Sequence, residues 1–432
     1  MVAASPRVLL IAHGFPPASG SGSVRALAFA RYLPMYVWRP TVLTVDMPWA
    51  ANRDDGLLAE VPGGLRVVRT PSLESRPAAH MPGAATATPA PRKPSAMRRH
   101  LGHLKRFPDA HLGWVPFAVA GGLRQQFDVL YSSSGPFSSH VVALTIQRLT
   151  GRPWVAELRD GWYEWNRAIF PDYPEWRGAL EQRLEAAVIR SASRVVLVTE
   201  RMATAFRRQY ADLPATHFSV VANGFDPAHF ASGPTERDDD AFEVVHAGAL
   251  YYGRSLASFL RAAARLVETD PEFAAAFRLT LLGTLDGAAQ SELRQSGLCD
   301  RITYRGQVDH ASTVRVLRAA NLMLLIANTT VGAEATVPGK LFEYLAAGQP
   351  ILAIASSSAS STADVMAQTG AGWLARADDV DEIGCRLRQA FASHRAGRPR
   401  RAEPRAIAAF DRRVLAGHLA AIFDEVRAAR RL

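Results

Sequence analysis

A lysine and a glutamate three residues apart open a predicted helix in VPGKLFEYLAAGQP, residues 337–350. Pro338 suits the first helical turn, and Lys340 adds a compact cation beside it. Glu343 follows about one turn later on a neighbouring face. A carboxylate near a helix start repels phosphate, so Glu343 is better suited to sugar or ribose hydroxyls, whereas Lys340 is suited to an anion. An exposed ion pair without a function is the alternative.

Arg254 is a second cation placed to bind an anion. It stands in HAGALYYGRSLASFLRAAARL, where a strand, a glycine turn and a helix follow one another. A guanidinium at a helix start can bind two phosphate oxygens at once, and the helix dipole attracts the same charge. A solvated arginine without a ligand is the alternative.

Gly20 and Gly22 lie in a third pattern that favours an anion, the loop of HGFPPASGSGSVRALAFARYL. A strand ends before this loop, and a helix opens near Ser23, whose hydroxyl can cap it. Glycines let the backbone approach a ligand, and the N–H groups of the helix start favour phosphate. The dinucleotide fingerprint is incomplete, because Arg25 stands where its third glycine belongs. A nicotinamide cofactor with Asp46 on its ribose, and a flexible surface loop, both remain open.

The elements that must position these residues are short β-branched runs that alternate with amphipathic stretches, which predicts βαβ units on parallel sheets. A first series of strands ends at FSVVA, and a second begins at FEVVHAG, after a Gly-, Pro- and acid-rich linker at 231–241. Two Rossmann-like domains are therefore expected, at 1–232 and 241–408, followed by a C-terminal helix at 409–432. The apolar spacing predicts one buried face on this last helical segment. That face consists of Ile407, Phe410, Val414, Ile422, Phe423 and Val426.

The composition restricts the class of protein. The chain has 432 residues, a net charge of +10 and two cysteines without ligand spacing, which indicate neither a disulfide framework nor a zinc site. No secretory signal and no stretch of roughly 20 apolar residues is found, which predicts a cytoplasmic protein that is not integral to a membrane. The positive charge favours an anionic partner, unless it only reflects an arginine-rich composition. No nucleic acid partner is expected, because no motif that reads bases accompanies the charge.

Two segments could bring the chain to an anionic membrane. Residues 97–106 form a predicted basic helix with an apolar stripe, after a loop at 76–97 that is rich in Pro, Ala and Thr. Residues 162–176 hold six aromatic side chains, which suit sugar stacking or a wet membrane interface. A solvated helix and ordinary core packing explain the same two segments equally well.

Six sequence motifs follow one another along the chain: FPPASGSGSVRALAFARYL, FPDAHLGWVP, ELRDGW, NGFDPAHF, HAGALYYGR and VPGKLFEYLAAGQPILAI. In order and spacing they resemble the retaining glycosyltransferases of family four, over nearly the whole chain. The chain is most similar to bacterial members that work on cell-surface glycans. The resemblance implies an α/β fold of the GT-B type, in which two Rossmann-like domains face a cleft and a C-terminal helix crosses back to the N-terminal domain.

The resemblance also implies roles in binding the donor. Arg254 matches the basic position that binds the donor diphosphate, and Glu343 matches the second glutamate of a paired motif, which contacts the nucleotide ribose. Gly20 and Gly22 match the loop that approaches the donor phosphates. The complete predicted donor-binding set is Gly20, Gly22, Gly248, Arg254, Lys340, Leu341 and Glu343.

Two departures from the family pattern concern recognition of the donor sugar. Ala335 stands where the first glutamate of the pair belongs, with Glu334 one position out of register. Ala249 replaces the arginine that usually follows the glycine of the second-domain turn. Glu334 could still reach the sugar if its loop shifts.

Asp160 is the predicted polar residue nearest the acceptor hydroxyl. It lies in PWVAELRDGW at the end of a first-domain strand, where relatives place a histidine or an aspartate and where Gly161 replaces the usual proline. Retaining transfer develops negative charge on the departing diphosphate, which Arg254 and Lys340 are expected to stabilise. A structural ion pair between Arg159 and Asp160 is the alternative.

The sequence therefore predicts a retaining glycosyltransferase that moves a sugar from a nucleotide-sugar, with a UDP-sugar as the expected donor, to a glycan or lipid-linked acceptor. Asp160, Arg254 and Lys340 are the predicted catalytic residues, and Arg25 and Trp162 the predicted acceptor contacts. No cofactor or metal ion is expected. Peripheral contact with an anionic membrane would hold the protein at the inner face of the cytoplasmic membrane. Three alternatives remain: a soluble small-molecule acceptor, a GT-B scaffold that binds sugar nucleotides without turnover, and an NAD-dependent oxidoreductase.

Overall fold

The computed structural model describes most of the chain as two compact units. The first comprises Met1–Val198, Ala203–Val221 and Ala416–Leu432, and the second comprises Thr199–Met202 and Ala222–Leu415. The predicted loop at 76–97, nearly all of the basic helix at 97–106, the linker except its two end residues, and part of the aromatic segment at 162–176 lie outside the described residues. The described residues are 5–46, 53–73, 102–103, 107–163, 166–167, 173–231, 241–251 and 253–430.

The first unit is built on a seven-stranded parallel sheet in the order β3-β2-β1-β4-β5-β6-β7. Every strand predicted in the first half of the chain is present. The strands are β1 (Arg7–Ile11), β2 (Arg39–Val45), β3 (Arg66–Thr70), β4 (Val129–Ser133), β5 (Trp154–Leu158), β6 (Arg194–Leu197) and β7 (Phe218–Val220). The central strands are buried on both faces, as expected for a parallel sheet covered by helices.

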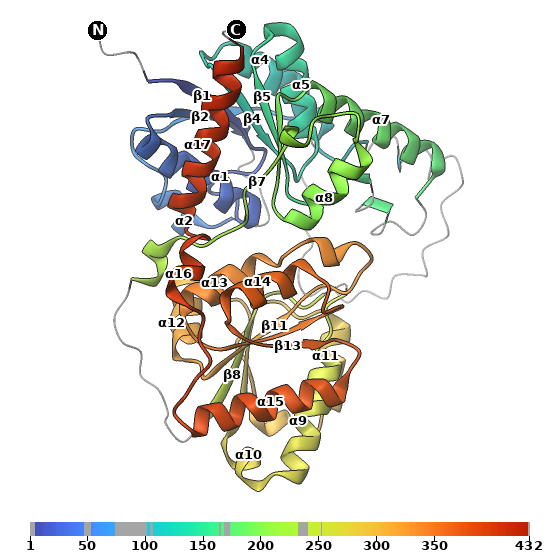
Figure 1. The fold of residues 1–432 in the computed structure, drawn as a ribbon, viewed down its shortest axis with the longest axis vertical. Coiled ribbons are helices and arrows are strands. Elements are labelled where there is room, and N and C mark those ends of the chain that lie inside the picture. Colours follow the sequence, from blue (N-terminus) through green and yellow to red (C-terminus); the bar gives the residue numbers. More distant parts are fainter. Residues whose placement is uncertain are drawn as a thin grey trace. The chain divides into compact units, whose positions relative to one another are not determined.

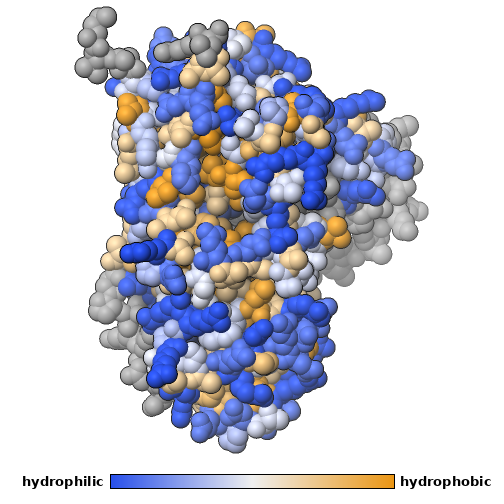
Figure 2. All heavy atoms as spheres, viewed as in Figure 1, coloured by the Kyte–Doolittle hydropathy of each residue, from blue (hydrophilic) through white to orange (hydrophobic). Residues whose placement is uncertain are grey.

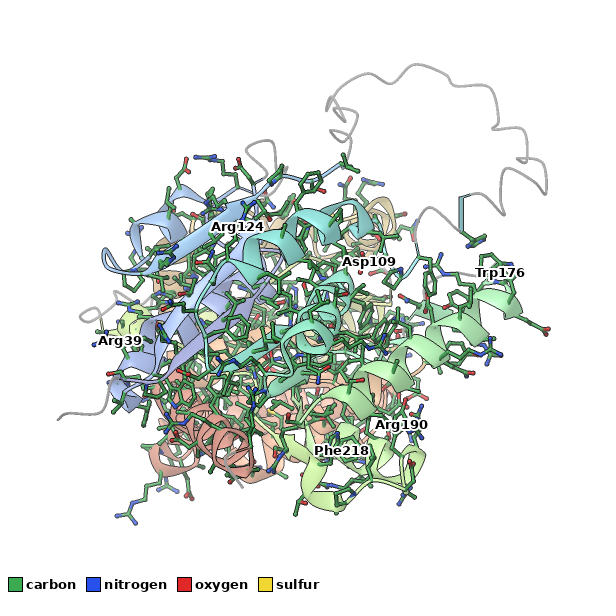
Figure 3. The ribbon with its side chains drawn as sticks, turned by 90° about the horizontal axis from the view of Figure 1, so that it is seen from above. Arg39, Asp109, Arg124, Trp176, Arg190 and Phe218 are labelled. Atoms are coloured by element: carbon green, nitrogen blue, oxygen red, sulfur yellow. The ribbon has the colours of Figure 1, made fainter. Side chains whose placement is uncertain are left out.

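Helices connect these strands, since parallel neighbours need crossover connections. They are α1 (Ser21–Tyr32), α2 (Asp55–Ala59), α4 (Val115–Leu123), α5 (Ser138–Thr150), α7 (Glu175–Ser191) and α8 (Glu200–Gln209). In the FPDAHLGWVP motif, the Asp109 carboxylate accepts hydrogen bonds from the Ser138 and His111 N–H groups, both at 2.8 Å. Asp109 therefore ties this motif to the start of α5. Figure 3 shows Asp109, and also Trp176 and Arg190 near the two ends of α7.

The second unit is built on a six-stranded parallel sheet in the order β10-β9-β8-β11-β12-β13. Successive residues of β11 point to opposite faces, so that Leu322 and Leu324 pack in one apolar core and Met323 and Leu325 in the other. The strands are β8 (Phe242–Ala247), β9 (Phe277–Leu282), β10 (Ile302–Tyr304), β11 (Leu322–Ile326), β12 (Ile351–Ala355) and β13 (Gly372–Arg376). The sequence predicted all of these except β13, whose run GWLAR is short and carries a glycine.

Helices cover both faces of this second sheet (Figure 1). They are α9 (Ala257–Thr269), α10 (Pro271–Ala276), α11 (Gly287–Gln295), α12 (His310–Ala319), α13 (Gly339–Ala347), α14 (Ser361–Thr369), α15 (Val380–Arg395) and α16 (Pro404–Ala408). Leu260, Ala263 and Leu266 lie on one buried face of α9, together with Leu256 directly before the helix. Hydrophilic residues cover the outward side of α15 (Figure 2). Within the described ranges, no helix has both the length and the apolar content to cross a bilayer.

The C-terminal helix α17 (Arg412–Ala429) begins in the second unit, and its residues from Ala416 onward belong to the first. The Phe423 ring lies 5.2 Å from the Trp38 ring and 5.9 Å from the Tyr131 ring, measured between centroids. One member of the predicted buried face is wrong, because Val414 is exposed while the next residue, Leu415, is buried. The predicted segment also breaks after α16, so that Ile407 belongs to a separate short helix.

Val37 holds a strained backbone conformation that offers a test of stability. It has φ 68°, in the left-handed region that a β-branched residue rarely adopts, and its N–H closes the turn of Leu33–Tyr36. Glycine or asparagine is usual at such a position. We expect Val37→Asn to raise the free energy of unfolding by about 1 kcal/mol, because the left-handed conformation costs about 1–2 kcal/mol for an ordinary residue. Thermal unfolding measures the gain.

Val37→Ala is the matched control, since alanine also has a Cβ. Its gain should be smaller than that of Val37→Asn. An equal gain for both variants would mean that the exposed apolar side chain, rather than the backbone, is the source of the effect.

Candidate functional site

In each sheet the chain order reverses between two neighbouring strands, β1 and β4 in the first unit and β8 and β11 in the second. Ligands of doubly wound folds bind outside the carboxyl ends of the strands at such a point. His13 and Ser134 lie just beyond β1 and β4, and Gly248 and Asn328 lie just beyond β8 and β11. Each unit therefore has one candidate ligand region, at these strand ends.

In the second unit, the loop after β8 carries Arg254 and is fastened to the loop after β11. The Gly253 carbonyl accepts hydrogen bonds from the Thr329 N–H at 2.9 Å and the Thr329 hydroxyl at 3.0 Å. Gly253 has φ +75°, and an added Cβ would lie 2.3 Å from Asn328 Oδ1. The Arg254 guanidinium lies 5.5 Å from the centroid of the Tyr251 ring, and no described carboxylate forms an ion pair with it. Arg254 therefore retains its capacity for an anionic ligand.

The start of α9 is less open to an anion than the sequence suggested. The helix begins at Ala257, three residues after Arg254. The Glu292 carboxylate accepts hydrogen bonds from the Ser255 hydroxyl at 2.7 Å and the Leu256 N–H at 2.9 Å, so a protein carboxylate already lies at this end. The Gly248 N–H donates to the Leu282 carbonyl at 2.8 Å and belongs to the sheet. The amides of Gly248 and Leu256 are therefore already engaged, and the Arg254 side chain is the candidate anion contact of this loop.

Lys340 and Glu343 form an ion pair with each other at the start of α13. The Lys340 Nζ lies 2.9 Å from Glu343 Oε2, and the two side chains are 39% and 23% exposed. Both side chains are thus partly accessible to a ligand. Each charge stabilises the charged form of the other residue. Leu341 has a different place from the predicted one: its side chain is fully buried in the core and its N–H donates to the Pro338 carbonyl at 3.0 Å. Leu341 therefore supports the helix and presents no polar group to a donor.

His246 is a site residue that the sequence reasoning missed. Its ring is buried in β8, and Nδ1 lies 2.9 Å from the Leu324 carbonyl. The pKa of His246 is lowered to about 4, mainly by burial and also by the charges of Arg254 and Lys340, against the opposing effect of the Leu324 hydrogen bond. The two predicted cations thus act on the same imidazole. A histidine at the end of the strand run FEVVHAG was the available signal.

The segment before α13 contains the departure from the paired-glutamate pattern. Ala335 ends a short 3-10 turn (Ala333–Ala335), and its carbonyl accepts hydrogen bonds from the hydroxyls of Thr199 at 2.6 Å and Ser361 at 3.0 Å. Glu334 is exposed. Because two hydroxyls hold the backbone at Ala335, a shift of this loop that would bring Glu334 inward must break both hydrogen bonds.

In the first unit, Arg159 lies beside the start of α1. The helix begins at Ser21, with Gly20 at φ 113° as its N-cap, so Ser23 is not the cap but is buried in the first turn. An added Cβ on Gly22 would lie 2.7 Å from Arg159 Nη2. The Arg159 Nε donates to the Ser134 carbonyl at 2.8 Å. Gly22 therefore makes room for a guanidinium, and the uncapped helix start and this cation together favour an anion.

Asp160 follows Arg159 directly and has the features of a polar group held ready for a substrate. Burial raises the pKa of the Asp160 carboxyl above its ordinary value, while the charge of Arg159 opposes this shift. Among the described residues, no hydrogen bond or ion pair to the Asp160 carboxylate is formed. The alternative of a direct Arg159–Asp160 ion pair is therefore not what the structure contains.

The two predicted acceptor contacts are buried. The Arg25 guanidinium pairs with Glu157 of β5, with Nη2 2.7 Å from Oε1, and the two side chains are 6% and 0% exposed. Trp162 is 1% exposed, and its ring stacks on Phe137 at 4.4 Å with an angle of 6° between the planes. The charge of Arg25 is neutralised within the core, and a face of Trp162 is covered by Phe137, so both residues are structural here.

Two family models match the chain. The glycosyl transferase 4-like domain matches residues 19–224, and the glycosyl transferases group 1 model matches residues 241–393. Together they cover most of both units, and they confirm the family resemblance predicted from the six motifs. No curated protein sequence matches the chain.

Solved structures share the fold at low sequence identity. A sucrose-phosphate synthase from Thermosynechococcus elongatus has a TM-score of 0.66 at 16% identity, over 98% of this chain and 99% of that chain. WaaG, a glycosyltransferase involved in lipopolysaccharide biosynthesis, has 0.58 at 13% identity, over 96% and 99%. A structure of trehalose-6-phosphate from E. coli bound with UDP-2-fluoro glucose has 0.59 at 12% identity, over 98% of both chains. These likenesses confirm the predicted fold class, with two Rossmann-like domains of the GT-B type.

Proposed function

Since the chain belongs to the group 1 glycosyl transferases and carries a glycosyl transferase 4-like domain before the group 1 domain, we propose that it is a retaining enzyme that uses a UDP-sugar. The sugar moves to a hydroxyl of a glycan or lipid-linked acceptor. The observation that carries this proposal is the position of two cations in the second unit: Arg254 in the loop after β8, without a carboxylate partner among the described residues, and Lys340 in the first turn of α13. Both charges also lower the pKa of His246 in β8. The family match argues against the alternative of an NAD-dependent oxidoreductase.

The chemistry that these residues can perform is stabilisation of a leaving group. As the glycosidic bond to the donor phosphate breaks, negative charge grows on the nucleoside diphosphate. Arg254 offers a planar guanidinium with no competing carboxylate in the described part of the chain, and Lys340 offers an ammonium whose charge is only partly offset by Glu343. Glu343 has a second carboxylate oxygen for the hydroxyls of the ribose. No step in this scheme requires a metal ion.

The acceptor side of the reaction is assigned to Asp160 in the first unit. A carboxylate with no protein hydrogen bond can accept one from the attacking hydroxyl and orient its lone pair. The proton then leaves with the departing phosphate, so Asp160 needs only to orient. Arg159 and the start of α1, with Gly20 and Gly22, are assigned to the donor phosphates.

The similar solved structures support the proposed donor and two different kinds of acceptor. The structure bound with UDP-2-fluoro glucose supports a UDP-sugar as the donor. WaaG, with its stated part in lipopolysaccharide biosynthesis, supports a lipid-linked acceptor, which would bring the protein to the inner face of the cytoplasmic membrane. A trehalose-phosphate synthase in complex with glucose-6-phosphate, with a TM-score of 0.61 at 11% identity, supports the alternative of a soluble acceptor.

A thermal-shift panel tests the proposed donor. UDP-glucose, GDP-glucose, dTDP-glucose and NAD are added separately to the full chain, followed by an assay for nucleotide release without acceptor. The proposal predicts the largest shift with UDP-glucose together with slow release of UDP. Stabilisation by NAD alone would contradict the proposal, and binding without any release would favour the non-catalytic scaffold.

Asp160→Asn and Glu343→Ala are expected to separate turnover from donor binding. Asp160→Asn should lower kcat about 10- to 100-fold, because the hydrogen bond that a charged carboxylate accepts from the attacking hydroxyl contributes about 1.5–3 kcal/mol, with the affinity for UDP-glucose nearly unchanged. Glu343→Ala should weaken the affinity about 10-fold or more, because hydrogen bonds to a charged group contribute about 1.5–3 kcal/mol. Isothermal titration and initial rates measure the two effects. Equal loss of affinity in both variants would refute this division of roles.

A further inference from the structure

The His246 side chain has a polar atom that the protein itself does not satisfy. The residue is 4% exposed and is the fifth residue of β8. Its Nε2 is buried and has no hydrogen-bond partner among the described residues. In the described part of the second unit, the only other buried side-chain nitrogen or oxygen without a partner is Nε of Arg386 on α15. A buried polar atom without a partner costs about 1–3 kcal/mol, so this one calls for an explanation.

The hydrogen bond of Nδ1 determines whether Nε2 carries a proton. Nδ1 lies 2.9 Å from the Leu324 carbonyl, and a carbonyl can only accept a hydrogen bond. Nδ1 must therefore carry the proton, which leaves a lone pair on Nε2. Burial and the two nearby cations keep the ring neutral, since they lower its pKa to about 4. At neutral pH, Nε2 is an acceptor and not a donor.

The position of Nε2 is at the ligand end of the strand. A Cβ added to Gly248, the first residue beyond β8, would lie 3.5 Å from Nε2, and apart from Gly248 and its two chain neighbours no described atom outside the His246 ring lies within 4 Å of that point. The neighbouring polar groups are satisfied, because the Ala247 N–H donates to the Tyr344 hydroxyl at 2.7 Å. The lone pair thus lies at the strand end where the chain order of the sheet reverses, beside the space that the missing Gly248 side chain leaves.

We propose that His246 Nε2 accepts a hydrogen bond from a hydroxyl of the bound sugar nucleotide and so determines donor specificity. This inference rests on the proposed function and deepens it. A lone pair repels phosphate oxygens, which carry no hydrogen, so the diphosphate belongs to Arg254 and Lys340 while Nε2 requires an O–H group. The hydroxyls of a sugar nucleotide come from the ribose and from the transferred sugar, and either could supply the donor.

His246→Asn is the sharpest test, because an asparagine amide can place its nitrogen near the position of Nδ1. The Leu324 hydrogen bond can then persist while the Nε2 acceptor is lost. Affinity is measured by titration with the tightest-binding member of the UDP-, GDP- and dTDP-glucose panel. We expect His246→Asn to weaken this affinity about 3- to 10-fold, the effect of one neutral hydrogen bond. His246→Phe, which keeps a planar ring without nitrogen, should give a similar loss.

Analogues of the same probe that lack one hydroxyl identify the source of the O–H group. One arm removes a ribose hydroxyl and the other removes single hydroxyls of the glucose. For one analogue, the affinity of the wild-type protein should fall by the same factor of about 3- to 10-fold that His246→Asn causes with the parent compound. His246→Asn should bind that analogue and the parent compound with equal affinity. If instead His246→Asn binds the parent compound and every analogue more weakly than the wild-type protein does, and by the same factor each time, the effect is structural and the inference is overturned.

Two measurements keep the test independent of folding and of the proposed function. With ¹⁵N-labelled histidine, the Nε2 resonance of the wild-type protein should shift when the sugar nucleotide binds, and an unmoved resonance in a saturated sample would overturn the inference. If the wild-type protein binds none of the sugar nucleotides, the proposed function fails first. If it binds them and His246→Asn binds them equally well, only the role of His246 fails.

Discussion

Glu157→Ala is expected to lower the free energy of unfolding of the first unit by about 3–5 kcal/mol, because it leaves the buried Arg25 guanidinium without its counter-ion. Arg25 Nε lies 3.1 Å from both Glu157 oxygens, and its Nη2 also donates to the Val221 carbonyl at 2.8 Å. The Ser133 hydroxyl donates to Glu157 Oε2 at 2.7 Å. The loss can be measured in urea, or by hydrogen exchange of amides in β4 and β5.

The pair also sets the expected response to acid. Burial would raise the pKa of Glu157, but the charge and hydrogen bonds of Arg25, together with the Ser133 hydroxyl, outweigh burial and hold it below its ordinary value. The stabilisation is therefore present at neutral pH, above the pKa of the unfolded chain, and is lost as the pH falls through the lower pKa of the folded state. The free energy of unfolding of Glu157→Ala should therefore change less with pH over this acid range than that of the wild-type protein.

An exposed pair in the same unit provides the control. Asp212 lies 3.2 Å from Arg190, but the two side chains are 58% and 47% exposed, so Asp212→Ala should cost no more than about 1 kcal/mol. The double variant Arg25→Met with Glu157→Leu should be less destabilised than Glu157→Ala, because no lone buried charge remains. Similar losses for Glu157→Ala and Asp212→Ala would show that the buried charge is not the source of the effect.

Arg254→Ala is expected to lower kcat/KM for sugar transfer or donor hydrolysis about 10²- to 10³-fold, equivalent to about 2.7–4 kcal/mol of transition-state stabilisation. Its guanidinium has no competing carboxylate among the described residues and acts with Lys340 on the same imidazole. The effect should be larger on kcat than on donor affinity, since the charge on the diphosphate grows as the bond breaks. Steady-state rates with UDP-glucose measure the effect on kcat, and titration with UDP measures the effect on affinity.

Arg261→Ala is the matched control, because Arg261 lies on α9 and its Nη2 donates a long, exposed hydrogen bond of 3.4 Å to the Ser258 hydroxyl. It should leave kcat/KM unchanged within about 2-fold, as for most surface substitutions. Arg254→Lys should recover only part of the lost rate, because an ammonium cannot bind two phosphate oxygens in the manner of a guanidinium. Full activity in Arg254→Ala would remove this residue from the mechanism.

Local patterns in the sequence predict the strands, the helices and the family. Runs such as RVLLIA and NLMLLIA become β1 and β11, because a strand buried on both faces needs nearly continuous apolar residues. The buried face of Leu260, Ala263 and Leu266 on α9, with Leu256 directly before the helix, follows from helical spacing alone. These features depend on residues close together in the chain, which is why one sequence is enough to find them.

Pairing between distant residues is where the sequence reasoning failed. Arg25 was a predicted acceptor contact, but its partner Glu157 stands 132 positions away in a buried strand. Glu292 reaches the start of α9 from 36 positions beyond Leu256, and no local spacing predicts that contact. Trp162 reads as a sugar platform until Phe137 is found stacked on it.

The sequence by itself therefore determined the fold class, the family and the positions of Arg254, Lys340 and Glu343 at element boundaries, because periodicity, turn residues and motifs are local. Only the tertiary structure decided which charges remain available to a ligand. It buried Arg25 against Glu157, placed Arg254 and Lys340 where their charges lower the pKa of His246, and left Asp160 without a partner among the described residues. The physical reason is that the cost of burying a charge or a lone pair depends on its neighbours in space, and those neighbours come from strands and loops far apart in the chain.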